Sequence, residues 1–380
     1  MISTSPGPRI AFADTLRGIA ASCVLVHHFF YTFWRKPQIV ADLIVYPAAI
    51  QLIEHAEGPR VPDFGLADFW GHFGVALFFL ISGFVIPFSV EALSRFGFAI
   101  ARILRIWPTY VVGLSITLIC VAANAASAHV AFPFGTWDVL SHYLILPRWP
   151  TLARPLDGII WTLEIEFAFY FFCAVMSNHL RNFDGSIFLW ALLSVPIGYA
   201  ASAAMNTLLA WSVPAFALAH WASSMAQFIA YMLVGTAFYY FFRSKISLRK
   251  LALVHALLLL AFIASWRLGV MSLQGWSGPI SYLIAYAAFA AAYAARGIFS
   301  RFPSRLSRLF SLLADISYPL YVVHAILGYS ILAHAIEAGA EPVLAVLLAL
   351  LVVLVAATIL HRVVEVPSRT VGKLLAKRYG

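Results

Sequence analysis

Charged side chains are scarce in this sequence. Asp, Glu, Lys and Arg make up only 11% of its 380 residues, whereas a soluble globular domain carries about 25%. Hydrophobic residues make up 62%, and no polar segment is long enough to form a separate soluble domain. The composition therefore excludes an ordinary soluble enzyme. It predicts an all-α, polytopic membrane protein that forms a single transmembrane domain over residues 1–380.

Cysteine is equally scarce. Cys23, Cys120 and Cys173 all fall inside apolar segments, without the spacing of metal ligands or of a disulfide framework. We expect them to be small buried side chains, and we expect no metal site. The sequence also has no visible internal repeat, low-complexity tract or cleavable signal peptide, so the first apolar run should be retained.

Ten apolar runs are long enough, or nearly so, to cross a bilayer core of about 30 Å. Segment 40–53 is also apolar, but it is short and Pro47 interrupts it, so we interpret it as an interfacial or re-entrant piece. If this segment were a span, every later loop would lie on the opposite side of the membrane. The predicted spans lie near residues 12–33, 72–90, 108–127, 159–177, 186–205, 222–242, 251–266, 279–295, 316–335 and 343–362.

The basic residues indicate the orientation of these spans. With the N-terminus inside, the inner segments hold 19 of the 25 Lys and Arg residues and the outer segments hold 6. This bias predicts ten spans with both termini cytoplasmic, in the inner (plasma) membrane of the cell. It also explains the net charge of +9 better than a nucleic-acid partner does, so no nucleic-acid partner is expected.

The first span carries the ionisable residues Asp14, Arg17, His27 and His28. Eleven helical steps of about 100° make roughly three turns, so Arg17 and His28 share one face about 16 Å apart. His27 points about 100° away from His28, while Asp14 can pair with Arg17. Ionisable groups inside a span predict a functional site. The alternatives are an Arg17 that snorkels to the inner interface and a His28 that is only hydrogen-bonded within the bundle.

Two arginines precede the third span. Arg102 and Arg105 are three residues apart, so they are expected to share a face at the cytoplasmic surface, with Pro108 opening the span. Two guanidinium groups there could bind phosphates in a bidentate manner. Anchoring to lipid head groups remains the alternative.

Two further spans carry polar stripes. In the fourth span Thr162, Glu166 and Tyr170 recur every four residues, while Glu164 points about 200° away. Glu166 is the better candidate for a buried functional carboxylate, which could orient a histidine or accept a proton. In the ninth span, one face carries Ser317, Tyr321 and His324.

Together, these segments resemble acyltransferase family 3, the integral-membrane O-acyltransferases of glycans. The resemblance covers almost the whole chain in order, from the Arg17–His28 spacing onward. Its departures are Ala76, where relatives carry an acid, Phe167 in place of a second adjacent carboxylate, and no SGNH hydrolase-like domain after the spans. The other segments that carry the resemblance are residues 74–84, 102–110, 161–170, 316–324 and 365–367.

The resemblance implies transfer of an acyl group, usually acetyl, from cytoplasmic acyl-CoA to a carbohydrate hydroxyl at or beyond the outer face. Acyl-CoA is then a co-substrate, and no permanently bound cofactor is expected. In this hypothesis Arg102 and Arg105 hold the CoA phosphates, and His28 is the general base or carries the acyl group. Glu166 orients a histidine or the acceptor, and Arg17 stabilises charge. The residues given supporting or substrate-binding roles are Asp14, Tyr170, Ser317, Tyr321 and His324.

Two other functions fit the same residues less well. A proton-coupled transporter or flippase of an acyl donor or lipid-linked sugar would also use intramembrane Arg, His and Glu. No inverted repeat is visible, however, and the Arg102–Arg105 pair suits phosphate binding. A catalytically inactive membrane scaffold has little need of buried charge, which is costly in a span.

Overall fold

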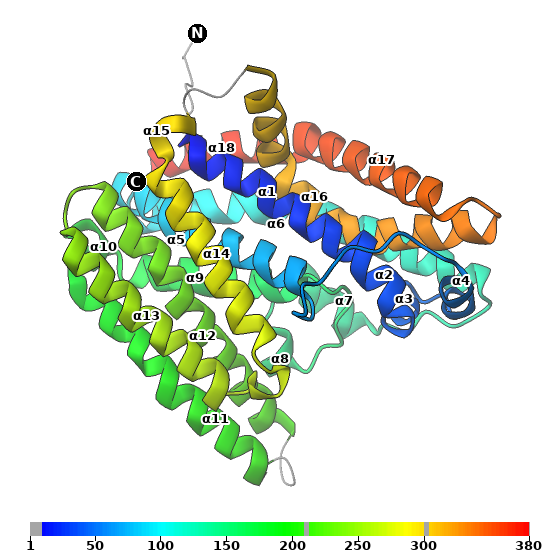
Figure 1. Ribbon diagram of the computed structural model, residues 1–380, viewed down its shortest axis with the longest axis horizontal. Helices are drawn as coiled ribbons and strands as arrows, with labels where there is room; N and C mark the ends of the chain where they lie inside the picture. Colours follow the sequence, from blue (N-terminus) through cyan, green and yellow to red (C-terminus); the bar gives the residue numbers. More distant parts are fainter. Residues whose placement is uncertain (1–9, 209–212, 300–303, 380) are drawn as a thin grey trace.

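The computed structural model describes residues 10–208, 213–299 and 304–379, and within these ranges every regular element is a helix. Figure 1 shows the helices packed side by side as a bundle. The elements are α1 (Ala11–His27), η1 (His28–Thr32), α2 (Phe33–Arg35), α3 (Pro37–Ile44), α4 (Ala49–His55), α5 (Phe69–Ala92), α6 (Arg95–Ser127), α7 (Thr136–Tyr143), α8 (Arg148–Thr151), α9 (Ile160–Val175), α10 (Ser177–Arg181), η2 (Gly185–Leu193), α11 (Ser194–Leu208), α12 (Val213–Phe242), α13 (Leu248–Leu268), η3 (Ser272–Gln274), α14 (Ser277–Ala294), α15 (Arg296–Phe299), α16 (Ser304–Glu337), α17 (Pro342–Leu360), η4 (His361–Glu365) and α18 (Val366–Arg378).

Seven helical segments in the described ranges are long and apolar enough to cross a membrane, which makes the chain a polytopic membrane protein. Helices also cover the other three predicted spans, as α1 with η1, α9 and α14. Two of these three are less apolar or shorter than a typical span, since α1 carries Asp14 and Arg17 and α9 has only 16 residues. The seven segments are Phe69–Ala92, Arg95–Ser127, Gly185–Met205, Val213–Phe242, Leu248–Leu268, Ser311–Glu337 and Pro342–Arg378.

Of two sequence-based expectations about local structure, the one for segment 40–53 agrees with the structure and the one for Pro108 is wrong. Segment 40–53 forms parts of two helices of eight and seven residues, broken at Val45, whose φ of 56° is left-handed. Neither helix approaches the roughly 20 residues that a span needs. The expectation that Pro108 opens a span is wrong, because Pro108 lies inside α6. That helix begins at Arg95, where the Ser94 hydroxyl caps it by accepting a hydrogen bond from the Gly97 amide at 3.0 Å.

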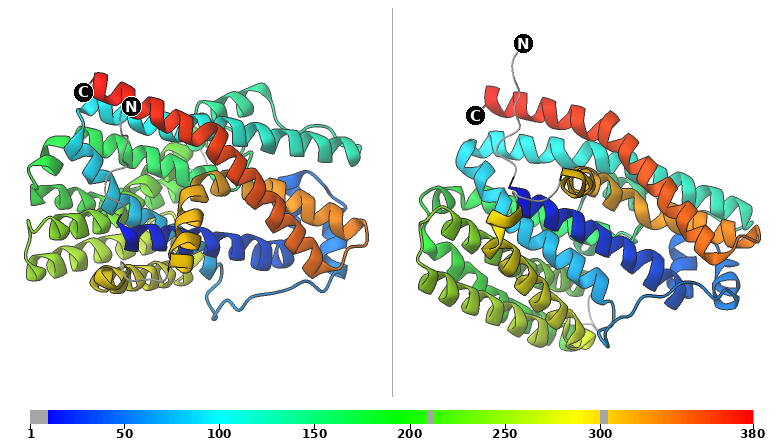
Figure 2. Two further views of the ribbon diagram at one scale, coloured as in Figure 1. Left: turned by 90° about the horizontal axis from the view of Figure 1, so that it is seen from above. Right: turned by 45° about the horizontal axis from the view of Figure 1, so that its top comes forward.

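The centre of the bundle is built on α1, α5, α12 and α16. Helix α1 packs against α5 and α16, α5 packs against α12 and α14, and α16 packs against α17 and α6. Helices α11 and α13 flank α12 on the side away from α17 (Figure 1). The start of α1 and the end of α18 lie at the same end of the bundle (Figure 2).

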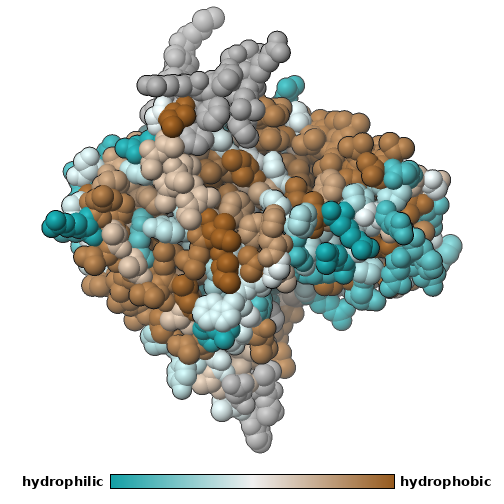
Figure 3. All heavy atoms as spheres, viewed as in Figure 1, coloured by the Kyte–Doolittle hydropathy of each residue, from teal (hydrophilic) through white to brown (hydrophobic). Residues whose placement is uncertain are grey.

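The outward faces of the bundle are apolar. Leu253 on α13 is 72% exposed and Leu344 on α17 is 62% exposed. Figure 3 shows hydrophobic residues over most of the visible helical surface, with hydrophilic residues gathered near α3 and α4. Such continuous exposed apolar surface suits contact with lipid rather than water.

Helices α5 and α12 meet at glycines. A Cβ on Gly83 would lie 1.9 Å from the Met232 carbonyl oxygen, and a Cβ on Gly235 would lie 2.3 Å from the Leu80 carbonyl oxygen. The Thr236 hydroxyl donates to the Gly83 carbonyl oxygen at 3.0 Å across the same contact. The backbones of α5 and α12 therefore approach closely at residue 83.

We expect Gly83→Ala to destabilise the bundle by about 3 kcal/mol or more, because the new methyl group collides with backbone that cannot rotate away. The measurement is the unfolding temperature and the monomer fraction after size-exclusion chromatography in detergent. Gly185→Ala is the matched control, since a Cβ there meets no atom within 4 Å. Equal stability of the two variants would contradict the close approach.

Candidate functional site

A cavity of about 80 Å³ lies at the centre of the bundle, between α1, α5, α6, α9 and α16. Its apolar wall includes Phe78 and Phe79, and its polar wall combines side chains from all five helices. Several of the predicted site residues meet here although they are up to 304 residues apart in the sequence. The polar and aromatic members of the wall are Arg17, Ser82, Arg105, Thr162, Glu166, Ser317, Tyr318 and Tyr321.

A second, strongly polar cavity of about 190 Å³ adjoins the first, because both are lined by Arg17, Arg105, Ser317 and Tyr318. It lies toward the end of the bundle where α1 begins and α18 ends (Figure 2). Four cations and three acids line it, so its wall is densely charged. The charged members are Asp14, Arg17, Arg105, Asp315, Glu365, Arg369 and Lys373.

Glu365 organises one side of this polar cavity. It is 1% exposed, and its carboxylate accepts hydrogen bonds from His361 Nδ1 at 2.7 Å and from Arg369 Nη1 at 3.5 Å. Arg369 and Lys373 were missed as cavity residues, although their spacing of four from Glu365 onward was a visible signal.

Arg102 and Arg105 lie in different surroundings. Arg105 lines both cavities, whereas Arg102 is only 9% exposed and donates from Nη2 to the Ser89 hydroxyl at 2.6 Å. The Arg102 guanidinium also lies over the rings of Phe98 and Tyr170, at 5.5 and 5.8 Å from their centroids. The expected pair of phosphate-binding arginines at one surface is thus separated. Phosphate binding by Arg102 stays a prediction that requires it to leave Ser89.

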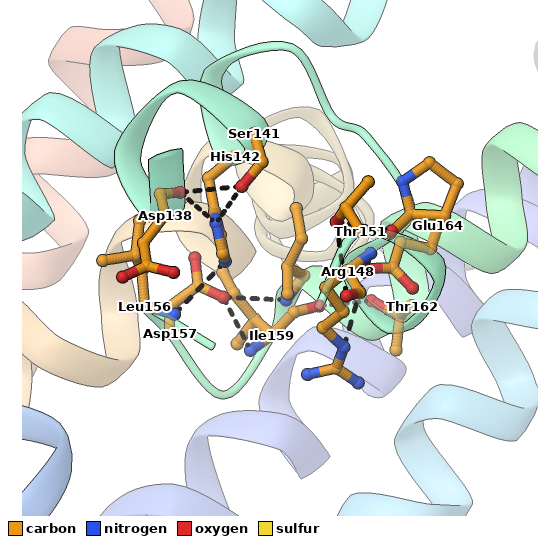
Figure 4. Close-up of polar contacts among 12 residues, drawn as sticks. Asp138, Ser141, His142, Arg148, Thr151, Leu156, Asp157, Ile159, Thr162 and Glu164 are labelled. Carbon is orange, nitrogen blue, oxygen red and sulfur yellow. Dashed lines mark hydrogen bonds and ion pairs between the residues drawn. The ribbon is translucent and has the colours of Figure 1, made fainter. Parts of the chain in front are cut away.

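The two carboxylates of α9 face opposite ways, as helical phase predicted. Glu166 lines the central cavity and accepts a short hydrogen bond from the Tyr170 hydroxyl. Glu164 is 5% exposed, accepts from the Arg148 amide at 3.1 Å, and lies 3.6 Å from Arg148 Nε (Figure 4). The two carboxylates therefore lie in different surroundings on opposite sides of α9.

The loop before α9 sets the position of this helix. Asp157 is 3% exposed and caps the helix start, accepting hydrogen bonds from the amides of Ile159 at 3.1 Å and Ile160 at 2.8 Å (Figure 4). His142 Nε2 accepts from the Leu156 amide at 3.2 Å, while its Nδ1 donates to the Asp138 carbonyl at 2.8 Å. Burial raises the pKa of Asp157 despite these amide contacts, and burial lowers the pKa of His142.

Tyr321 connects the wall of the central cavity to the buried histidines. Its hydroxyl lies 2.7 Å from that of Thr162, and its ring lies 6.2 Å from the ring of Phe78. Thr162, Phe78 and Tyr321 all line the cavity. The ring of His324 also packs against Tyr321, with 5.7 Å between the two centroids.

His28 and His324 form a buried pair of imidazoles. Their ring centroids lie 4.6 Å apart in an edge-to-face arrangement, and His324 is 0% exposed. His324 Nδ1 lies 2.8 Å from the Tyr321 carbonyl oxygen, so Nδ1 carries the proton and Nε2 keeps its lone pair. No described residue hydrogen-bonds to His324 Nε2. His28 Nδ1 lies 2.5 Å from the Tyr329 hydroxyl, which leaves Nε2 as its other nitrogen.

His27 has separate partners. Its Nε2 lies 3.1 Å from the Thr32 hydroxyl and 3.8 Å from Asp68 Oδ1, and Asp68 in turn accepts from Lys36 Nζ at 2.6 Å. His27 and His28 therefore have different partners, as the difference in their helical phase predicts. Tyr329 was missed, because 301 residues separate it from His28 and nothing local marks it.

A family model described as an acyltransferase domain matches residues 10–362. The chain belongs to the acyltransferase 3 family. The protein is therefore an acyltransferase, and the all-α bundle places it among multi-pass membrane enzymes. No curated protein and no solved structure matches the chain.

The family match covers most of the residues that line the two cavities. Both cavities and the His28–His324 pair lie almost wholly inside residues 10–362, while Glu365, Arg369 and Lys373 lie just beyond them. The charged wall of the polar cavity is thus completed by α18 and the turn before it. This acyltransferase therefore needs its last helix to build the cavity.

The Asp68–Lys36 pair gives a pH prediction. Burial opposes ionisation of Asp68, but the hydrogen bond and charge of Lys36 outweigh it and hold the Asp68 pKa below its ordinary value of 3.8. A depressed folded-state pKa adds stability above the unfolded pKa that is lost as pH falls through the folded value. We expect Asp68→Asn to lower the unfolding temperature at pH 7, and we expect this deficit to shrink below pH 3.8. Solvent exposure of the pair keeps the effect small. A deficit that stays constant down to pH 3 would contradict it.

Proposed function

We propose that this acyltransferase moves an acyl group, specifically acetyl, from cytoplasmic acyl-CoA to a hydroxyl of a cell-envelope carbohydrate. The observation that carries the proposal is the line of polar side chains through the bundle. It runs from the charged cavity, past Arg17 and Glu166, to the Thr162–Tyr321 hydrogen bond and the His28–His324 pair. An acyl group that is transferred across the membrane needs such a path.

The proposed topology is ten spans in the inner (plasma) membrane with both termini cytoplasmic. It adds α1 with η1, α9 and α14 to the seven apolar helices, and it forms one domain over the chain. The supporting observation is the distribution of basic residues, 19 inside against 6 outside. This orientation puts the charged cavity on the cytoplasmic side, where acyl-CoA is made.

The donor end is assigned to the charged cavity. Acyl-CoA carries several phosphate groups, and in this proposal Arg105, Arg369 and Lys373, which line the charged cavity, hold them at the inner end of the path. Acyl-CoA is a co-substrate that arrives and leaves, not a resident cofactor. Its pantetheine arm is narrow and flexible enough to follow the path past Arg17. The thioester would then be presented near Tyr321.

The chemistry is assigned to the two imidazoles. An unprotonated Nε2 of His28, held by Tyr329 at Nδ1, removes the proton of the acceptor hydroxyl as its oxygen attacks the thioester carbonyl. The tetrahedral intermediate collapses by breaking the C–S bond, and the imidazolium returns its proton to the CoA thiolate. The products are an O-acyl ester and free CoA. His324 supports His28, and Arg17 stabilises charge at the donor end.

The test is radiolabelled acetyl-CoA with the purified protein in liposomes that contain envelope carbohydrate. Label in the carbohydrate supports the enzyme. Vectorial uptake of label without transfer would instead favour a carrier of acyl donors or lipid-linked sugars and would overturn the proposal.

A further inference from the structure

A third cavity, of about 250 Å³, lies on the opposite side of α9 from the central one. The two faces of α9 divide as its phase requires, with Trp161 and Glu164 on this cavity and Thr162 and Glu166 on the central one. The start of α5, the first half of α12, the end of α13 and the start of α14 contribute to the rest of the wall. In the proposed topology all these helix ends lie at the outer side of the membrane. The cavity is unused by the mechanism above.

Uncharged donors in this wall include three buried groups with no hydrogen-bond partner among the described residues. They are the Trp266 indole N–H, the Tyr282 hydroxyl and the Ser224 hydroxyl, in side chains that are 1%, 0% and 7% exposed. A buried polar group without a partner costs about 1–3 kcal/mol. Three such groups in one wall indicate a site that is completed by a bound molecule with several hydroxyls.

The other residues of the wall indicate which chemical class of molecule binds there. Trp161, Trp266 and Tyr282 offer flat apolar rings, which pack against the C–H faces of a pyranose while neighbouring donors bind its hydroxyls. The one carboxylate, Glu164, lies beside the one guanidinium, Arg148, at 3.6 Å. Their charges cancel, so the wall favours a neutral polyol over a phosphate or another anion.

We propose that this cavity binds a sugar ring of the acceptor, an inference that rests on the proposed function. His72 lines this cavity, and Gly71 precedes it in α5. The backbone of Gly71 packs closely on the His27 ring, because a Cβ built on Gly71 would lie 2.7 Å from the His27 ring. His28 is the next residue along the chain. A sugar held here therefore lies beside the segment that carries the proposed base.

An apolar groove of about 430 Å³ meets the same cavity. It runs between α9 and α12 and shares Glu164 and Met225 with the cavity wall. Phe171 in the groove is 73% exposed, so the groove faces lipid. The sugar ring thus has two possible sources, a free saccharide or a lipid-linked one, and the groove is placed to take the lipid.

The test uses radiolabelled acetyl-CoA and membranes of the source cell, which supply the natural acceptor. Tyr282→Phe deletes only the unpartnered hydroxyl, and Tyr199→Phe at a 63% exposed position is the matched control. We expect Tyr282→Phe to cut transfer of label to carbohydrate at least tenfold, with the KM for acetyl-CoA within twofold of wild type. The unfolding temperature should not fall, because no protein hydrogen bond is lost.

Three outcomes separate the possibilities. Transfer by Tyr282→Phe within twofold of wild type overturns the sugar site, and so does unchanged transfer by Ser224→Leu, which fills the cavity. Absence of transfer by wild type overturns the proposed function instead. Competition by octyl but not methyl glycosides assigns a lipid-linked acceptor, and competition by both assigns a free one.

Discussion

His28→Ala is expected to reduce acyl transfer by about 10²–10⁴-fold while the protein remains folded, because it removes the proposed general base. The measurement is transfer of radiolabelled acetyl from acetyl-CoA to carbohydrate, normalised to folded protein by size-exclusion chromatography. His28→Gln, which keeps a polar side chain but has no base, should lose as much. The pair His28–His324 then stands as the chemical centre.

His27→Ala is the matched control for that experiment. His27 is the neighbour in sequence, yet its partners are Thr32 and Asp68 rather than His324. We expect this variant to keep activity within about tenfold of wild type, and to lose stability rather than chemistry. Near-normal transfer by His28→Ala, or equal losses in both variants, would remove His28 from the role of base.

Arg17→Ala is expected to lower kcat/KM for acyl-CoA by about 10²-fold, or about 2.7 kcal/mol. Arg17 lines both the central and the charged cavity, so the donor must pass it. Arg17→Lys keeps the charge but not the planar fork, and should recover part of the loss. Kinetics at varied acetyl-CoA and fixed acceptor measure both effects.

The control for Arg17 is Arg267→Ala, on α13, where the guanidinium stacks 4.8 Å from the Trp276 centroid away from both cavities. That variant should behave as wild type. A loss in Arg17→Ala that Arg17→Lys does not relieve at all, together with reduced folded yield, would assign Arg17 to structure alone.

The sequence predicted the helices well because their cause is local. Each long apolar run must satisfy its own backbone hydrogen bonds in lipid, so apolar runs and helices coincide from α5 to α17. Helical phase also separated Glu164 from Glu166, since one regular helix carries both. The start of α6 was missed because amphipathic residues 95–107 extend the helix before the apolar run begins.

The assembly of the site could not be predicted from the sequence in the same way. The contact between His28 and Tyr329 joins residues 301 apart, and Arg102 turns toward Ser89 because α5 happens to lie there. Such contacts depend on how helices pack, which local periodicity does not encode. The family resemblance selected most of the residues that meet at the central cavity, but not Arg369 or Lys373 beyond it.

The π-helical turn at His28–Thr32 has a consequence for the history of the chain. A π turn holds one more residue than the α turn that it replaces, and such turns are often found at functional sites. Loss of one residue from this turn would restore a plain α turn and leave the residues after it on their present faces. Relatives that lack the turn should therefore align with a one-residue gap between His28 and Lys36. The distribution of that gap among relatives would show when the segment around His28 gained its extra residue.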